Sequence, residues 1–200
     1  MVVGLSVGAL LVARIAGGPG LSGVAQSAVA VGGALLALPV ARVMQARGRR
    51  PGLMLGYAAA AIGAALVVTA AALNSVLIAL VGMFLFGGAT TANGQARYTA
   101  TDLATPERRG RHLSTVIWAT TIGAVAGPML AAPADRVTAP FGLPPLAGPF
   151  VFSLLAFLAA GVVLMGLLRP DPLLTARRLS ASGVGARSGA AATPEGGAEP

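Results

Sequence analysis

Arg42-Val-Met-Gln-Ala-Arg-Gly-Arg-Arg-Pro51 is the stretch of sequence that decides the fold. It holds four of the fourteen arginines in a chain that has no lysine. On each side lies a run of about twenty residues, mostly Ala, Val, Leu and Gly, which is the length of a helix that crosses a bilayer. A basic segment between two such runs predicts a short loop held at one face of a membrane.

The composition indicates an integral membrane protein. Hydrophobic residues make up 56% of the 200 positions and charged residues only 10%, whereas a soluble domain carries about 25% charged residues. The net charge of +8 would suggest nucleic acid as the partner of a soluble protein. Here the arginines stand at the ends of apolar runs, where they meet lipid headgroups. We therefore expect the lipid bilayer as a partner, and no nucleic acid.

Six apolar runs predict an all-α domain over residues 1–178. The predicted spans cover residues 2–16, 21–41, 51–73, 76–96, 113–132 and 150–168. A loop rich in Pro and Gly is expected from Pro133 to Pro149. Residues 179–200 are too poor in large apolar side chains to form a core, so they predict a disordered cytoplasmic tail.

Small residues in the third run predict close helix packing. Gly52, Gly56, Ala60 and Ala64 recur every four residues, slightly more than one helical turn. They form a stripe at which the backbone of another helix can approach. Asn74-Ser75, which follows this run, predicts a tight turn.

The arginines also predict the orientation of the chain. Residues 42–50, residues 97–111 and the part from residue 169 onward hold twelve of the fourteen, which leaves Arg14 and Arg136 for the other side. Because short cytoplasmic loops carry an excess of arginine, both termini are predicted to be cytoplasmic. We expect a multi-pass protein of the cell inner (plasma) membrane.

A family resemblance rests first on residues 41–50. They resemble the pattern G-x-x-x-D-R-x-G-R-R, which major facilitator superfamily transporters carry between their second and third helices. Gly48, Arg49 and Arg50 match, whereas Gln45 stands where the family has an acid. The chain looks like the amino-terminal half of such a transporter, and the resemblance implies six helices arranged as two inverted three-helix repeats. In the family this loop helps to latch the two halves together. The alternative is a basic loop that only anchors the protein.

A second resemblance lies in the fifth run. Gly123-x-x-x-Gly127-Pro128 is similar to the family's antiporter-type motif, G-x-x-x-G-P-x-x-G-G, with Ala131 and Ala132 in place of the last two glycines. The glycines permit close helix contact, and the proline bends the helix. The resemblance implies a role in the direction of transport. The alternative is ordinary packing through small residues.

The candidate cavity is neutral. No Asp or Glu falls within a predicted span, and a carrier of cations usually keeps such an acid in the membrane. The polar residues that could line a cavity, or instead bond one helix to another, are Gln26, Thr91, Asn93, Gln95, Arg97 at the rim, and Trp118.

Enzyme chemistry is not expected. The chain has no cysteine, no lysine for a phosphate-binding loop, a single histidine and no carboxylate pair in a span. We expect no metal site and no cofactor.

Taken together, the patterns predict a secondary carrier that moves a small organic solute by alternating access, with efflux as a candidate direction. The chain would be a truncated or split half, which needs a second six-helix half from another chain or from a copy of itself. The alternative is a non-transporting membrane fragment, or a scaffold that packs other helices.

Overall fold

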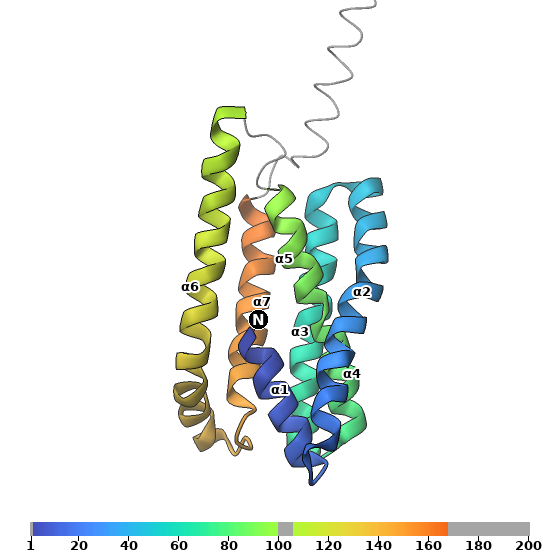
Figure 1. The fold of residues 1–200 in the computed structure, drawn as a ribbon, viewed down its shortest axis with the longest axis vertical. Coiled ribbons are helices and arrows are strands. Elements are labelled where there is room, and N and C mark those ends of the chain that lie inside the picture. Colours follow the sequence, from blue (N-terminus) through green and yellow to red (C-terminus); the bar gives the residue numbers. More distant parts are fainter. Residues whose placement is uncertain (1, 100–105, 168–200) are drawn as a thin grey trace, which may run out of the picture.

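A computed structural model describes residues 2–99 and 106–167 as a bundle of helices (Figure 1). Every regular element in these ranges is helical, as the sequence predicts. The elements are α1 (Val2–Ile15), the short 3-10 helix η1 (Pro19–Leu21), α2 (Ser22–Arg47), α3 (Arg49–Leu73), α4 (Val76–Phe86), α5 (Gly88–Thr99), α6 (Pro106–Thr138), the 3-10 helix η2 (Ala139–Phe141) and α7 (Gly148–Leu167). The tail predicted for residues 179–200 lies outside the described residues.

Five helical segments of the described chain are long and apolar enough to cross a membrane. They are Pro19–Arg47, Arg49–Leu73, Val76–Ala96, Leu113–Phe141 and Gly148–Gly166. A sixth apolar helix, Gly4–Ile15, is shorter, and α1 begins at mid-height of the bundle (Figure 1). Five of the six predicted runs thus appear as membrane-length helices.

The small-residue stripe of α3 is buried in the centre of the bundle. Gly52, Gly56, Ala60 and Ala64 are all buried, and α3 packs against α2, α4, α5 and α7. The contacts are so close that a Cβ on Gly63 would lie 2.6 Å from the carbonyl oxygen of Gly82 on α4. Glycine allows this close approach, which gives the two helices extensive van der Waals contact. Such contact matters in a bilayer, because lipid tails are as apolar as the side chains and no hydrophobic effect drives helices together.

The predicted arginine loop is almost entirely helical, which corrects the prediction for residues 42–50. α2 continues to Arg47 and α3 begins at Arg49, so Gly48 alone separates them. Arginine is a good helix former, and nothing between Arg42 and Arg47 breaks the helix. The chain reverses at Gly48, whose φ is 101°. Residues with a side chain rarely adopt this conformation, so a glycine suits the turn.

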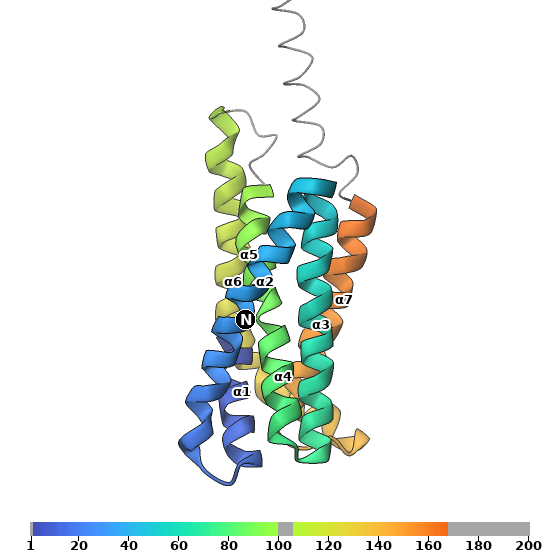
Figure 2. The same ribbon diagram turned by 90° about the vertical axis from the view of Figure 1, so that its right-hand side faces the viewer.

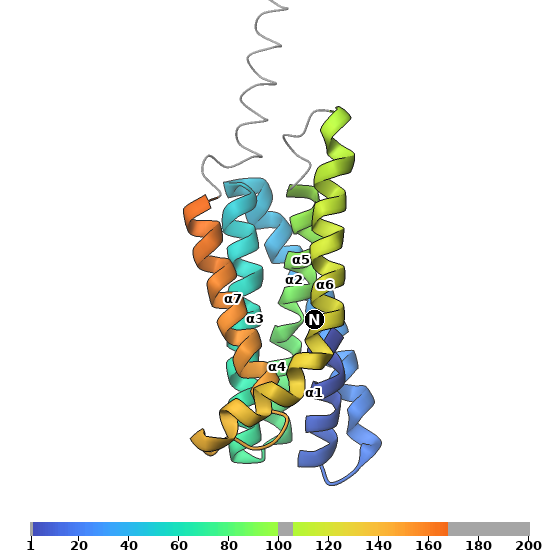
Figure 3. The same ribbon diagram turned by 90° about the vertical axis from the view of Figure 1, so that its left-hand side faces the viewer.

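The fifth helix is also longer than predicted. Residues 133–138 were expected in a loop, but α6 continues through Pro128 and Pro133 to Thr138. A proline removes one backbone hydrogen bond, and a helix in lipid bends at it because unwinding would leave more groups unsatisfied. Figure 3 shows this bend: the last part of α6 turns aside from its straight first part.

Asp135 therefore lies in a helix and not in a loop, and it attaches α6 to α7. Its carboxylate oxygens accept hydrogen bonds from the backbone N–H groups of Leu146 at 2.9 Å and Gly148 at 3.0 Å. Gly148 is the first residue of α7, where backbone N–H groups have no partner within the helix and a negative charge is favourable.

The two ends of the bundle carry different segments. The turn at Gly48, the end of α5, the start of α6 and the end of α7 lie at one end (Figures 1 and 2). The α1–α2 turn and the α6–α7 connection lie at the other end, where Arg14 donates a hydrogen bond to the carbonyl oxygen of Pro145 at 3.2 Å. The turn at Asn74 also lies there, with Asn74 in the left-handed conformation (φ 50°) as a helix cap, as the sequence predicts.

Candidate functional site

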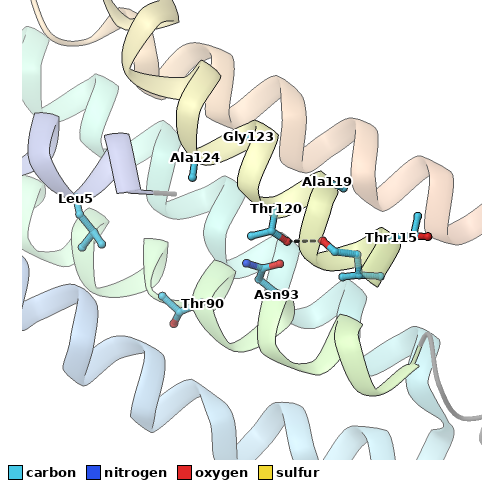
Figure 4. Close-up of a pocket in the computed structure, with 9 residues that line it drawn as sticks. Leu5, Thr90, Asn93, Thr115, Ala119, Thr120, Gly123 and Ala124 are labelled. Atoms are coloured by element: carbon cyan, nitrogen blue, oxygen red, sulfur yellow. Dashed lines mark hydrogen bonds between the residues drawn. The ribbon is translucent and has the colours of Figure 1, made fainter. Parts of the chain in front are cut away.

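A cleft of about 660 Å³ lies between α1, α5 and α6 (Figure 4). Its lining is mainly apolar, with a few hydroxyl and amide groups, and includes no charged side chain among the described residues. The lining residues are Leu5, Thr90, Asn93, Thr115, Val116, Ala119, Thr120, Gly123 and Ala124.

A break in the fourth predicted span positions one wall of this cleft. α4 ends at Phe86 and α5 begins at Gly88, so Gly87 divides a run that was expected to be one helix. A Cβ added to Gly87 would meet backbone atoms of α2, and one added to Gly88 would lie 2.8 Å from the carbonyl oxygen of Gly56 on α3. These contacts hold one face of α5 against α2 and α3, which leaves another face for the cleft.

Asn93 is the amide side chain in the cleft. Figure 4 shows it on α5, directed toward Thr120 on α6. Within residues 2–99 and 106–167, Asn93 makes no side-chain hydrogen bond, and it is partly exposed. An amide offers two donor N–H bonds and one acceptor oxygen, so Asn93 can supply both donors and an acceptor to the cleft.

The threonines of the cleft are bonded to their own helices. Their hydroxyl groups donate to backbone carbonyl oxygens: Thr90 to Gly87 at 2.5 Å, Thr115 to Arg111 at 2.9 Å and Thr120 to Val116 at 2.7 Å. Each hydroxyl oxygen keeps acceptor capacity. The cleft can therefore accept hydrogen bonds from a neutral solute at several points, and donate them from Asn93.

The other predicted cavity residues lie elsewhere. Thr91 donates to the carbonyl oxygen of Gly33 on α2 at 2.7 Å, a helix-to-helix bond. Gln95 accepts from Arg49, Gln26 is exposed on α2, and the Trp118 side chain is 69% exposed on α6. Arg97 belongs to α5, but its side chain lies outside the described residues.

Three polar lining residues were missed by sequence reasoning: Thr90, Thr115 and Thr120. A signal was available, because Thr115, Ala119 and Gly123 recur every four residues, and Thr120 and Ala124 continue the same face. Threonines in an apolar run were not distinctive enough to be chosen without knowing which face is open.

The arginines at the α2–α3 turn connect this turn to two other helices. Arg49 donates from Nη1 to Gln95 Oε1 on α5 at 3.3 Å, and to the sulfur of Met44 at 3.7 Å. Arg50 donates from Nη2 to the carbonyl oxygen of Met165 near the end of α7 at 2.8 Å. Gln45, at the position of the family's acid, is exposed on α2.

The residues of the predicted antiporter-type motif face open space. Gly123 lines the cleft, and a Cβ added to it would meet no atom within 4 Å in the described structure, so this glycine makes no close helix contact here. Gly127 lines a second cavity of about 290 Å³ between α1, α6 and α7. Pro128 is exposed and lies inside α6.

No group of three or more His, Cys, Asp or Glu side chains gathers into a metal site in the described part of the chain. The described lining of the cleft offers hydroxyl and amide groups and no charged side chain.

Comparison with known proteins identifies the family. The sequence profile of the Major Facilitator Superfamily matches residues 1–192. The chain is 39% identical to the uncharacterized MFS-type transporter YdeG of Bacillus subtilis (strain 168) over 182 residues, which cover 91% of this chain and 42% of YdeG. It is 37% identical to the uncharacterized MFS-type transporter YddS of the same organism over 177 residues, which cover 88% of this chain and 41% of YddS.

The chain therefore spans about two fifths of the length of these relatives. No solved structure matches it. The family match covers nearly the whole sequence and agrees with the helical bundle and its membrane-length segments, so the chain belongs to the Major Facilitator Superfamily and is an integral membrane protein.

Proposed function

We propose that this chain forms one half of a secondary carrier, and that the cleft between α1, α5 and α6 is its half of the solute cavity. The observation that carries the proposal is the open, neutral cleft around Asn93. In this proposal the chain acts as a carrier, because the described lining of its cleft offers hydroxyl and amide groups that can bind a solute.

The solute class follows from the lining. Apolar walls favour an organic molecule, and the Asn93 amide and the threonine oxygens suit its hydroxyl, amide or carbonyl groups. A charged solute would enter without a counter-charge, at a high cost in free energy. Solutes of this kind would leave the cell, since the Gly123 to Pro128 segment resembles the antiporter-type motif.

The second half would close the open side of the cleft. α6 exposes an apolar stripe at Trp118, Ile122, Val125 and Met129, which are spaced as one face of a helix. In this proposal a second six-helix half, from another chain or another copy of this one, covers part of α6, and the two halves move about the cavity between them. α1 then counts as the first of six spans, arranged as two inverted three-helix repeats.

We also propose that the end with the Gly48 turn faces the cytoplasm, together with both termini. Support comes from the distribution of arginines, because residues 42–50 and 97–111 and the part after residue 168 hold twelve of fourteen. The membrane would be the bacterial inner membrane.

The absence of cysteine from the sequence makes single-cysteine labelling a direct test. Asn93→Cys and Thr120→Cys place a thiol in the cleft, Ala64→Cys places one in the packed core, and Leu158→Cys places one on an exposed apolar face. In cells that express the full chain, we expect a hydrophilic maleimide to label the two cleft positions and neither control. Neutral solutes that bind should slow the labelling.

A scaffold that only packs other helices gives a different result. Its cleft would be filled by another helix or by lipid, so both cleft thiols would resist the reagent. Labelling of the cleft thiols with no protection by any member of a broad panel of neutral solutes would also count against the proposed solute class.

A further inference from the structure

A further apolar surface lies between α3 and α7, two helices that run side by side at one edge of the bundle (Figure 2). It is a groove of about 220 Å³, whose walls include Ala58 and Ala61 from α3 and Gly161 and Met165 from α7. Its floor is aromatic: Tyr57 packs against Phe157 with ring centroids 6.1 Å apart. Leu158 and Val162 at its edge are 53% and 69% exposed.

Arg50 lies at one end of this groove. Its Nη2 atom donates to the carbonyl oxygen of Met165 at 2.8 Å, and Met165 lines the groove. Arg49, also at the start of α3, and the exposed Arg42 and Arg47 add positive charge at the same end. The carboxylate of Asp135 lies far from Arg50, because it accepts hydrogen bonds at the start of α7, at the opposite end of the bundle. The groove thus joins an apolar channel to a strongly positive mouth.

The distance from Arg50 to the far end of the groove matches one leaflet of a bilayer. Arg50 and Ala61 lie about 16 Å apart along α3 at 1.5 Å per residue, and half of the hydrocarbon core is about 15 Å thick. A lipid whose headgroup is held at Arg50 could therefore extend an acyl chain to Ala61, near the middle of the membrane.

We propose that the groove between α3 and α7 binds one anionic phospholipid, with its phosphate at Arg50 and one acyl chain along Tyr57, Ala61 and Gly161. The charge at the mouth selects the headgroup, since cytoplasmic-leaflet anionic lipids are attracted by arginines next to the membrane. The apolar walls hold the chain. The site is separate from the cleft and does not depend on the solute.

Native mass spectrometry of the full chain, with phosphatidylglycerol and phosphatidylcholine added in equal amounts, tests this proposal. We expect a single phosphatidylglycerol adduct that exceeds the phosphatidylcholine adduct severalfold. Arg50→Gln should lower it about fivefold, the factor that one arginine near an anionic surface supplies. Arg42→Gln, which removes an exposed charge on α2, should lower the adduct less than Arg50→Gln does.

A groove-filling variant tests the acyl chain independently of the charge. A Cβ on Gly161 meets no atom within 4 Å in the described structure, so Gly161→Leu should fold while its side chain occupies the groove. It should abolish the adduct. Gly166→Leu is the matched control, because Gly166 also lies on α7 and has the same free space outside the groove.

Four outcomes would overturn the lipid site. Equal adducts of the two lipids would show that charge selects nothing. An equal loss in Arg42→Gln and Arg50→Gln would indicate diffuse attraction to the whole basic segment. Retention of phosphatidylglycerol by Gly161→Leu, or its displacement by millimolar inorganic phosphate, would assign the arginines a phosphate site without an acyl chain.

Discussion

α3 and α6 are both long and apolar, yet they relate to the rest of the chain in opposite ways. Half of the most apolar part of α3 is buried, whereas none of the corresponding part of α6 is. α3 presents glycines and alanines to helices on several sides, and α6 presents Trp118, Ile122 and Met129 to the outside. In a membrane, the small residues of α3 and the large residues of α6 are all apolar enough to face lipid. The size of the side chains, more than their hydropathy, therefore decides which helix is enclosed by the rest of the chain.

The largest expected effect on stability comes from replacing one glycine on α3 and one on α6 by leucine, which tests the contrast between the two helices directly. Gly63→Leu would drive a side chain into the backbone of Gly82 and Leu85 on α4. We expect a loss of about 3 kcal/mol or more of stability, seen as aggregation or a much lower Tm in detergent. Gly123→Leu on α6 meets open space and should change stability by about 0.5 kcal/mol or less. Equal losses in the two variants would contradict the contrast between the helices.

A smaller effect is expected where α6 is attached to the bundle. Asp135→Ala removes the acceptor of the Leu146 and Gly148 N–H groups, so we expect a loss of about 2 kcal/mol. Thermal unfolding followed by circular dichroism would measure it. Arg136→Ala, an exposed neighbour on the same helix, should unfold at the wild-type temperature. Identical melting of the two variants would mean that the carboxylate does not hold the two helices together.

The smallest effect sharpens the comparison at the level of one hydroxyl group. Thr91→Val removes a bond between α5 and α2, which is worth about 0.6 kcal/mol in lipid. Thr120→Val removes a bond within α6 only, so its stability should not fall measurably. If Thr120→Val were the more damaging change, the Thr120 hydroxyl would have a structural role that the cleft geometry does not give it.

Most of the fold could be predicted from the sequence, because length and hydropathy determine a membrane span with little help from neighbours. Ends of helices were harder. A cluster of charges marks the membrane surface, but it does not oblige the backbone to unwind, so α2 runs on to Arg47. Pro133 was expected to begin a loop, but α6 continues through it to Thr138.

The site was less predictable, for a geometric reason. Thr91 and Asn93 are two residues apart, so they lie on different faces of α5 and meet different neighbours. One bonds to α2 and the other faces the cleft. Sequence alone shows that both are polar, and only the packing of α5 against α2 and α3 decides which of them a solute could reach.

The one-residue turn at Gly48 has a mechanical consequence. Adjacent Cα atoms are only about 3.8 Å apart, so α2 and α3 are tied at that end and cannot separate there. Their relative freedom is reduced to rotation about the backbone dihedrals at Gly48, and Arg49 and Arg50 oppose this rotation through α5 and α7. Any movement of one of these two helices at this end would therefore carry the other with it.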